Sequence, residues 1–360
     1  MILKVYQKYL TKEFVITSFK IIFIFFVLGF IMGILEEIKF FSDFEVPYYY
    51  PLYLVTLNIP SLIYEIFPFI FLITSQLYFL KLHEKNELHT FKINGLTNFK
   101  LLKIIITTSM ILGFLIITIF YNFAATLKFQ YLDIKKDYTK DNKYLATITE
   151  NGLWIKDQID DQINFVNAKK FSLDLLEDVD IIQLTNNFEF LRNIKSKKVN
   201  ISDNKWIIYD AKIIENNNII FKKDEMRMNS NFDYKEINSL FANLSSLNLW
   251  DLIQLKKSYE AINYSTTEVN YHIQRIFAYP FLITIITLLT SILMINVNAQ
   301  KPKIIFIVLG IILSVFIYYV NSFFGTLGKN EKIPLLISIW SPIIILSIIS
   351  IIGLVKINDK

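Results

Sequence analysis

Histidine is the side chain best suited to binding a metal or moving a proton near neutral pH, and this chain has three: His83, His89 and His272. His83 and His89 are six positions apart, whereas two metal ligands on one helix face are typically four apart. No cysteine occurs, and the sequence has no phosphate-binding glycine loop, dinucleotide fingerprint or HExxH metalloprotease motif. We therefore expect no catalytic residue, no metal and no cofactor, and we interpret the histidines as solvated or interfacial.

A short helix predicted over about residues 83–95 is suited instead to binding a partner protein. Acidic side chains lie in its early turns, two apolar side chains three positions apart share a face, and a glycine ends it. These residues are Glu84, Glu87, Leu88, Phe91 and Gly95. Such a helix could sit in a groove of a cytoplasmic partner and pass on its movement. The alternative is an amphipathic linker that rests on lipid headgroups.

Long apolar runs surround this segment. The chain is 53% hydrophobic, and the run Val15 to Leu35 contains only Thr17, Ser18 and Lys20 as clearly polar residues. About 20 helical residues cross a hydrocarbon layer about 30 Å thick. The sequence therefore predicts six transmembrane spans, at about residues 15–35, 52–80, 101–125, 277–297, 303–325 and 334–355. The first run is longer than the apolar part of a signal peptide, so we expect a retained helix.

Lysines near the ends of these spans predict the orientation. They precede the first span, crowd the second and fourth connections and close the chain: Lys4, Lys8, Lys12, Lys81, Lys85, Lys92, Lys100, Lys103, Lys301, Lys303, Lys356 and Lys360. Alternating spans place all of them on one side. By the positive-inside rule both termini are cytoplasmic and the long third connection faces outward, because long translocated domains are largely exempt from the rule.

That third connection, residues 137–270, predicts an all-β domain. Its short segments rich in Ile, Val, Tyr and Phe are separated by Asn, Asp and Gly: Tyr144–Ile148, Gly152–Lys156, Ile163–Ala168, Val179–Leu184, Trp206–Ile214 and Ile219–Lys222. An antiparallel sandwich, jellyroll or open barrel fits this pattern, followed by a helical return over residues 236–259. The predicted architecture is residues 1–136 with three spans, 137–270 with a jellyroll-like β domain, and 271–360 with three spans.

Residues 86–97 resemble the coupling-helix signature of the lipopolysaccharide export permeases, the LptF/LptG (YjgP/YjgQ) family. The acid, the following leucine, the glycine and the final threonine are kept as Glu87, Leu88, Gly95 and Thr97, whereas the pattern departs at Asn86, Thr90, Phe91 and Ile93. Further resemblance lies in Asn58-Ile59-Pro60, Phe67-Pro68, Glu150 to Asp157, Phe323-Phe324-Gly325 and Ile333-Pro334. The stretch Gly152 to Asp157 resembles LptG more than LptF.

The resemblance implies a permease subunit of an ABC transporter in a Gram-negative inner membrane. Such a transporter extracts lipopolysaccharide and passes it to a periplasmic bridge for export to the outer membrane. The implied partners are a homologous permease subunit, a cytoplasmic ATPase dimer (LptB-like) and periplasmic bridge proteins (LptC/LptA-like). The ATPase would hydrolyse ATP, and it would bind the permease at Glu87 and Leu88. The net charge of +5 is explained by topology, so we expect no nucleic-acid partner.

The resemblance also implies a substrate site. Lipopolysaccharide carries phosphates on an acylated disaccharide, so its site should pair apolar walls with cations near the outer interface. Lys39 and Lys135 match basic positions of the family and Glu36 an acidic one, whereas Gly33 and Leu132 stand at positions where the family is basic. The candidate substrate-binding residues are Glu36, Lys39, Lys128, Lys135, Tyr64, Phe67 and Tyr318.

Simpler interpretations exist for these candidates. Lys39 and Lys135 could snorkel to the interface, and the aromatic residues could serve helix packing or an interfacial belt. Glu65, inside the second predicted span, marks either a water-filled cavity or plain interfacial solvation.

Two other functions stay open at this point. A secondary transporter would need internal repeats, broken helices and charges at mid-membrane, and the predicted spans are nearly free of such charges. A membrane-anchored sensor or structural protein with an outward β domain would need no docking helix.

Overall fold

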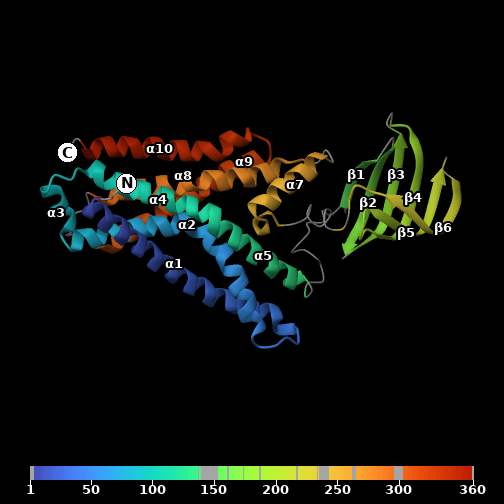
Figure 1. Cartoon of the computed structure of the whole chain (residues 1–360), viewed down its shortest axis with the longest axis horizontal. Coiled ribbons are helices and arrows are strands. Elements are labelled where there is room, and N and C mark those ends of the chain that lie inside the picture. Colours follow the sequence, from blue (N-terminus) through green and yellow to red (C-terminus); the bar gives the residue numbers. More distant parts are fainter. Residues whose placement is uncertain are drawn as a thin grey trace. The chain divides into compact units, whose positions relative to one another are not determined.

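A computed structural model of the chain describes residues 4–136, 138, 153–159, 162–172, 174–185, 188–215, 218–232, 234, 243–261, 265–295 and 303–358. Backbone contacts divide the chain into two compact units (Figure 1). The helical unit comprises Met1–Lys128 and Asn270–Lys360, and the β unit comprises Phe129–Val269.

Long apolar helices dominate the first and last parts of the chain. In chain order they and their short connecting helices are α1 (Val5–Phe40), η1 (Phe41–Asp43), α2 (Tyr50–Glu84), α3 (Glu87–Ile93), α4 (Asn98–Leu115), the π-helical η2 (Ile116–Phe120), α5 (Tyr121–Lys136), α8 (Thr267–Ile295), α9 (Lys303–Lys329) and α10 (Leu335–Asn358). Among the described residues, six stretches are long and apolar enough to cross a membrane: Val5–Phe40, Tyr50–Glu84, Asn98–Lys135, Thr267–Ile295, Ile305–Lys329 and Leu335–Ile357. The six predicted spans are confirmed by length and composition.

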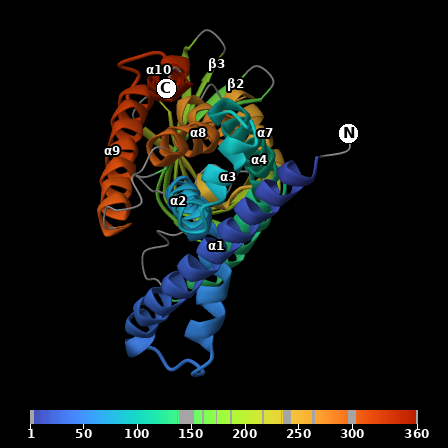
Figure 2. The same ribbon diagram turned by 90° about the vertical axis from the view of Figure 1, so that its left-hand side faces the viewer.

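Close helix approaches hold the helical unit together. α1 packs along α2, α9 packs against α2 and α10, and α4 contacts α1 and α10 (Figure 2). Where α4 meets α8, a Cβ atom added to Gly113 would lie 2.9 Å from the Cα atom of Pro280. Small residues permit such approaches where lipid offers no hydrophobic gain for helix association.

One end of the helical unit gathers both chain ends and α3. Tyr9 near the start of α1 hydrogen-bonds Glu87 of α3, and a ring nitrogen of His83 lies 3.0 Å from the carbonyl oxygen of Met294 at the end of α8. The side chain of Asn98 at the start of α4 donates to the carbonyl of Ile357, at 3.3 Å. The labels N, C and α3 fall at the same end in Figure 1. This is the arrangement that alternating spans require.

The β unit contains one antiparallel sheet in the described residues. Its strands are β1 (Leu153–Ile159), β2 (Gln162–Ser172), β3 (Leu175–Thr185), β4 (Phe190–Asn200), β5 (Lys205–Glu215) and β6 (Asn218–Asn229), and each pairs with the next. Five of the predicted strand segments are confirmed, β4 was not predicted, and Tyr144–Ile148 lies outside the described residues. The strands form a meander; the jellyroll class stays a prediction.

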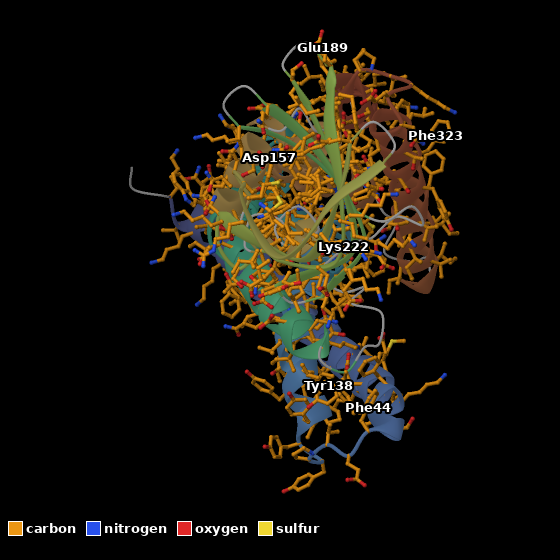
Figure 3. The ribbon with its side chains drawn as sticks, turned by 90° about the vertical axis from the view of Figure 1, so that its right-hand side faces the viewer. Phe44, Tyr138, Asp157, Glu189, Lys222 and Phe323 are labelled. Carbon is orange, nitrogen blue, oxygen red and sulfur yellow. The ribbon has the colours of Figure 1, made fainter. Side chains whose placement is uncertain are left out.

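The sheet curves around a core to which all six strands contribute. Trp206 of β5 is 0% exposed, and its ring nitrogen donates to the carbonyl of Phe232, at 2.7 Å. The buried carboxylate of Asp157 in β1 accepts from the Ser230 hydroxyl at 2.8 Å and from the backbone and side-chain amides of Asn231 at 3.1 and 2.8 Å. These bonds join the first strand to the segment after the last. Figure 3 labels Asp157, Glu189 and Lys222 on this unit.

The predicted helical return is present in part. The described residues after β6 include η3 (Leu244–Ser246) and α7 (Leu249–Ala261). α7 begins after Asn248, whose side-chain oxygen accepts from the backbone amides of Trp250 and Asp251, both at 2.9 Å. Such a side-chain cap satisfies amides that have no partner within the helix. Its inner face buries Leu252 and Leu255.

Candidate functional site

A short helix occupies the place where the sequence predicted one. α2 ends in a last turn that includes Glu84, and Asn86 reverses the chain with a φ of 55°, a left-handed conformation that Asn tolerates better than most residues. α3 then runs from Glu87 to Ile93, and Gly95 follows with a φ of 80°. Glu84 therefore belongs to α2 and the other four predicted residues to α3 and its end.

Glu87 is the best-connected side chain of α3. The Tyr9 hydroxyl donates to both of its carboxylate oxygens, each at 2.9 Å. The Lys85 amine lies 3.7 Å from one of the same oxygens. The Glu87 side chain is still 24% exposed, so the carboxylate is oriented by its own chain and remains accessible to a cation of a partner.

The predicted docking face of α3 is partly turned inward. Leu88 is 3% exposed, and the half-buried Phe91 ring lies 6.4 Å from the Tyr9 ring. The outward face carries His89, Lys92 and Ile93. Partial burial lowers the pKa of the Lys92 amine. Leu88 and Phe91 therefore anchor α3, whereas Glu84, Ile93 and Gly95 are exposed.

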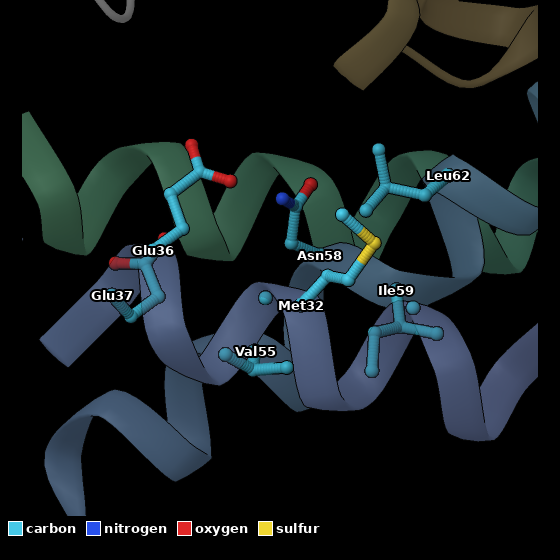
Figure 4. Close-up of a pocket in the computed structure, with 9 residues that line it drawn as sticks. Met32, Glu36, Glu37, Val55, Asn58, Ile59 and Leu62 are labelled. Atoms are coloured by element: carbon cyan, nitrogen blue, oxygen red, sulfur yellow. The ribbon is translucent and has the colours of Figure 1, made fainter. Parts of the chain in front are cut away.

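The second half of α1 and the first half of α2 form a small cavity that contains one predicted substrate residue. Its volume is about 160 Å³, and it is lined by Gly29, Met32, Gly33, Glu36, Glu37, Val55, Asn58, Ile59 and Leu62 (Figure 4). Drug-sized ligands usually occupy roughly 300–1,000 Å³. The cavity is therefore too small for an acylated disaccharide, and its two carboxylates do not favour phosphate. Lys39 is exposed and does not line it.

The other two predicted lysines differ in their surroundings. Lys128 is half-buried, and its amine lies 3.8 Å from the Glu65 carboxylate. Glu65, ambiguous in the sequence, thus pairs with a cation. Lys135 is 3% exposed, and its amine donates to the Tyr131 hydroxyl at 2.7 Å. Lys135 belongs to the β unit and Lys39 to the helical unit.

The predicted aromatic residues fall into two groups. Tyr64 stacks on Tyr279, with ring centroids 4.7 Å apart, and buried Phe67 packs edge-on against Phe120. Both therefore take part in helix packing within this chain. Tyr318 is exposed on α9, and its ring contacts only that of the next residue, Tyr319, among the ring contacts of the described residues.

Sequence reasoning missed a group of cations beside Lys128. The ring nitrogen of half-buried His272 in α8 lies 3.1 Å from the Tyr121 hydroxyl in α5, and Arg275 follows one turn later on α8. The Lys329 amine lies over the Tyr271 ring, 5.1 Å from its centroid. We call Lys128, Arg275 and Lys329 the cationic cluster. The sequence does contain one sign of this cluster. Arg275 stands at the start of the fourth span, where an ionisable residue is costly.

Comparison with protein families decides the class of this chain. The model of the lipopolysaccharide export system permease LptF/LptG matches residues 8–356. The chain belongs to the LptF/LptG family. A search of curated proteins finds no match. The family match spans α3, the cationic cluster and both units, so this LptF/LptG protein is a multi-pass lipopolysaccharide export permease.

Proposed function

We propose that this LptF/LptG permease is one of two homologous subunits of an ABC transporter. The pair extracts lipopolysaccharide from a Gram-negative inner membrane and passes it to periplasmic bridge proteins of the LptC/LptA type. The observation that carries the proposal is α3, a short helix between two spans that presents the Tyr9-oriented Glu87 carboxylate at its surface. The LptG type is favoured by the stretch Gly152 to Asp157.

The α3 end is the docking end for a cytoplasmic ATPase dimer. The sequence has no phosphate-binding loop, so the energy for extraction comes from a partner. Lysines crowd the same end of the helical unit, as the positive-inside rule requires of a cytoplasmic face. In this orientation both termini are cytoplasmic and the β unit is periplasmic.

The substrate side uses the cationic cluster together with Lys39. Lipid A phosphates pair well with lysine and arginine at the outer interface. Acyl chains would lie against exposed apolar side chains such as Phe23 of α1 and Phe316 and Tyr318 of α9. Lys135 acts structurally through Tyr131, and Glu36 lines the small cavity rather than binding phosphate.

Purification of the chain with its native partners tests the proposal. We expect a paralogous six-span subunit and a nucleotide-hydrolysing dimer to co-purify, lipopolysaccharide to be found by mass spectrometry, and ATP hydrolysis to respond to that lipid. Glu87→Lys should lose the ATPase or uncouple hydrolysis from transport. A monomer without a nucleotide-hydrolysing partner, or a fully assembled and active Glu87→Lys complex, would contradict the docking function.

A further inference from the structure

We propose that Tyr9 is the positioning residue that transmits movement of α3 to α1, an inference that rests on the proposed function of α3. Its hydroxyl holds both oxygens of the Glu87 carboxylate at 2.9 Å. The same ring contacts Phe91 one turn further along α3. A single residue of α1 therefore touches α3 at two successive turns.

A second contact fixes the same part of α1 to the end of α2. Glu13, four positions after Tyr9, forms a salt bridge with Lys81 in the last turns of α2. Residues four apart lie on one helix face, so Tyr9 and Glu13 present one face of α1 to the α2–α3 turn. The start of α1 is thus held at three points by the segment on which an ATPase would act.

The contact to Glu87 is suited to transmission because it is directional and charge-assisted. Hydrogen bonds to an ionised carboxylate are shorter and stronger than bonds between neutral groups. The carboxylate keeps part of its surface exposed, so a partner's cation can bind while Tyr9 stays in place. A force on Glu87 would then reach α1, whose exposed apolar side chains beyond Glu13 include Phe19, Phe23 and Ile31.

The test is Tyr9→Phe in the full complex, which removes the hydroxyl and keeps the ring beside Phe91. We expect the ATPase to co-purify in the normal amount, while the lipopolysaccharide released per ATP hydrolysed falls about tenfold, the scale of hydrogen bonds to a charged group. Tyr6→Phe is the matched control, since it removes a hydroxyl from the same turn of α1, and it should release lipid normally. Both variants should remain folded in detergent, since Tyr9→Phe keeps the ring beside Phe91 and the salt bridge between Glu13 and Lys81.

A double variant separates this role from general disruption. If Tyr9 acts through Glu87, adding Tyr9→Phe to Glu87→Ala should cause no further loss of coupling. Glu87→Gln, which keeps an acceptor for the hydroxyl, should retain more coupling than Glu87→Ala.

The outcomes distinguish this inference from the function on which it rests. Normal lipid release by Tyr9→Phe overturns the transmission role and leaves the docking function intact. Loss of the ATPase, or failure of Tyr9→Phe to fold, also overturns it, because Tyr9 would then act in docking or folding. A wild-type complex without any ATPase overturns the proposed function itself.

Discussion

Gln76 of α2 shows how one buried polar side chain constrains the helix beside it. It is 3% exposed, and its amide nitrogen donates to the carbonyl of Phe306 in α9 at 2.7 Å. A Cβ atom added to Gly310 would lie 1.9 Å from that nitrogen. Leaving a buried N–H group unpaired is costly, so the bond from Gln76 to Phe306 requires the free space that Gly310 leaves on α9.

We expect Gly310→Ala to destabilise the helical unit by about 1–3 kcal/mol, because the methyl group must displace Gln76 or separate α2 from α9. The measurement is the melting midpoint of the full chain in detergent. Gly29→Ala is the matched control, since nothing lies within 4 Å of a Cβ atom added there, and alanine favours a helix over glycine. Equal midpoints for Gly310→Ala and wild type would contradict the constraint.

A second prediction at the residue scale concerns the exposed cations Lys39 and Arg275. Reversing charge by Lys39→Glu together with Arg275→Glu should lower photo-crosslinking to lipopolysaccharide several-fold, because exposed ion pairs contribute roughly 0.2–1 kcal/mol each. Assembly should be unaffected. The control is Lys356→Glu, an exposed residue at the opposite, α3 end of the helical unit. Unchanged crosslinking in the double variant would mean that both side chains only snorkel to the membrane interface and do not bind lipopolysaccharide.

At the scale of elements, β4 and α3 show what the sequence could and could not predict. The membrane helices were predictable because a hydrocarbon layer demands long apolar runs. β4 was missed because its sequence is dominated by charged and polar residues such as Arg192 and Lys197. It forms because neighbouring strands pair with it and Asp180 of β3 lies 3.3 Å from Lys195.

The position of the short helix at the candidate site could be predicted from the sequence, whereas the direction in which its side chains point could not. Glycine and acidic residues placed a short helix near Glu87, which α3 bears out. The bond from Tyr9 to Glu87 joins residues 78 positions apart in sequence, which no local pattern reports. The cationic cluster was missed for the same reason, because Lys128, Arg275 and Lys329 lie on three different helices.

Asp157 supplies the prediction at the element scale. Asp157→Ala should loosen the β unit by about 1–3 kcal/mol, because it removes three accepted hydrogen bonds and leaves the buried Ser230 hydroxyl without this acceptor. Limited proteolysis of the full-length chain should show faster cleavage within residues 153–232, with the spans still protected. Asp203→Ala, in the exposed β4–β5 turn, should cleave at the wild-type rate. Equal cleavage rates for Asp157→Ala and Asp203→Ala would show that Asp157 does not hold β1 to the segment after β6.

At the scale of the whole molecule, the proposal depends on which side of the membrane each unit faces. ATP is available to a partner of α3 only in the cytoplasm, whereas a bridge to the outer membrane must meet the β unit in the periplasm. The six spans of the described residues return the C-terminus to the side of the N-terminus, and α3, between the second and third of them, lies on that side too. The proposal therefore requires α3 and the β unit to face opposite compartments.

The absence of cysteine from the sequence makes this requirement directly testable, because each introduced thiol is the chain's only one. His89→Cys places it on the exposed face of α3, and Glu189→Cys places it on the exposed β3–β4 turn. A maleimide that cannot cross the inner membrane should label Glu189→Cys in cells with a permeabilised outer membrane, and His89→Cys only after the inner membrane is broken. Labelling of His89→Cys from outside would leave α3 with no access to an ATP-driven partner, and the docking function could not stand.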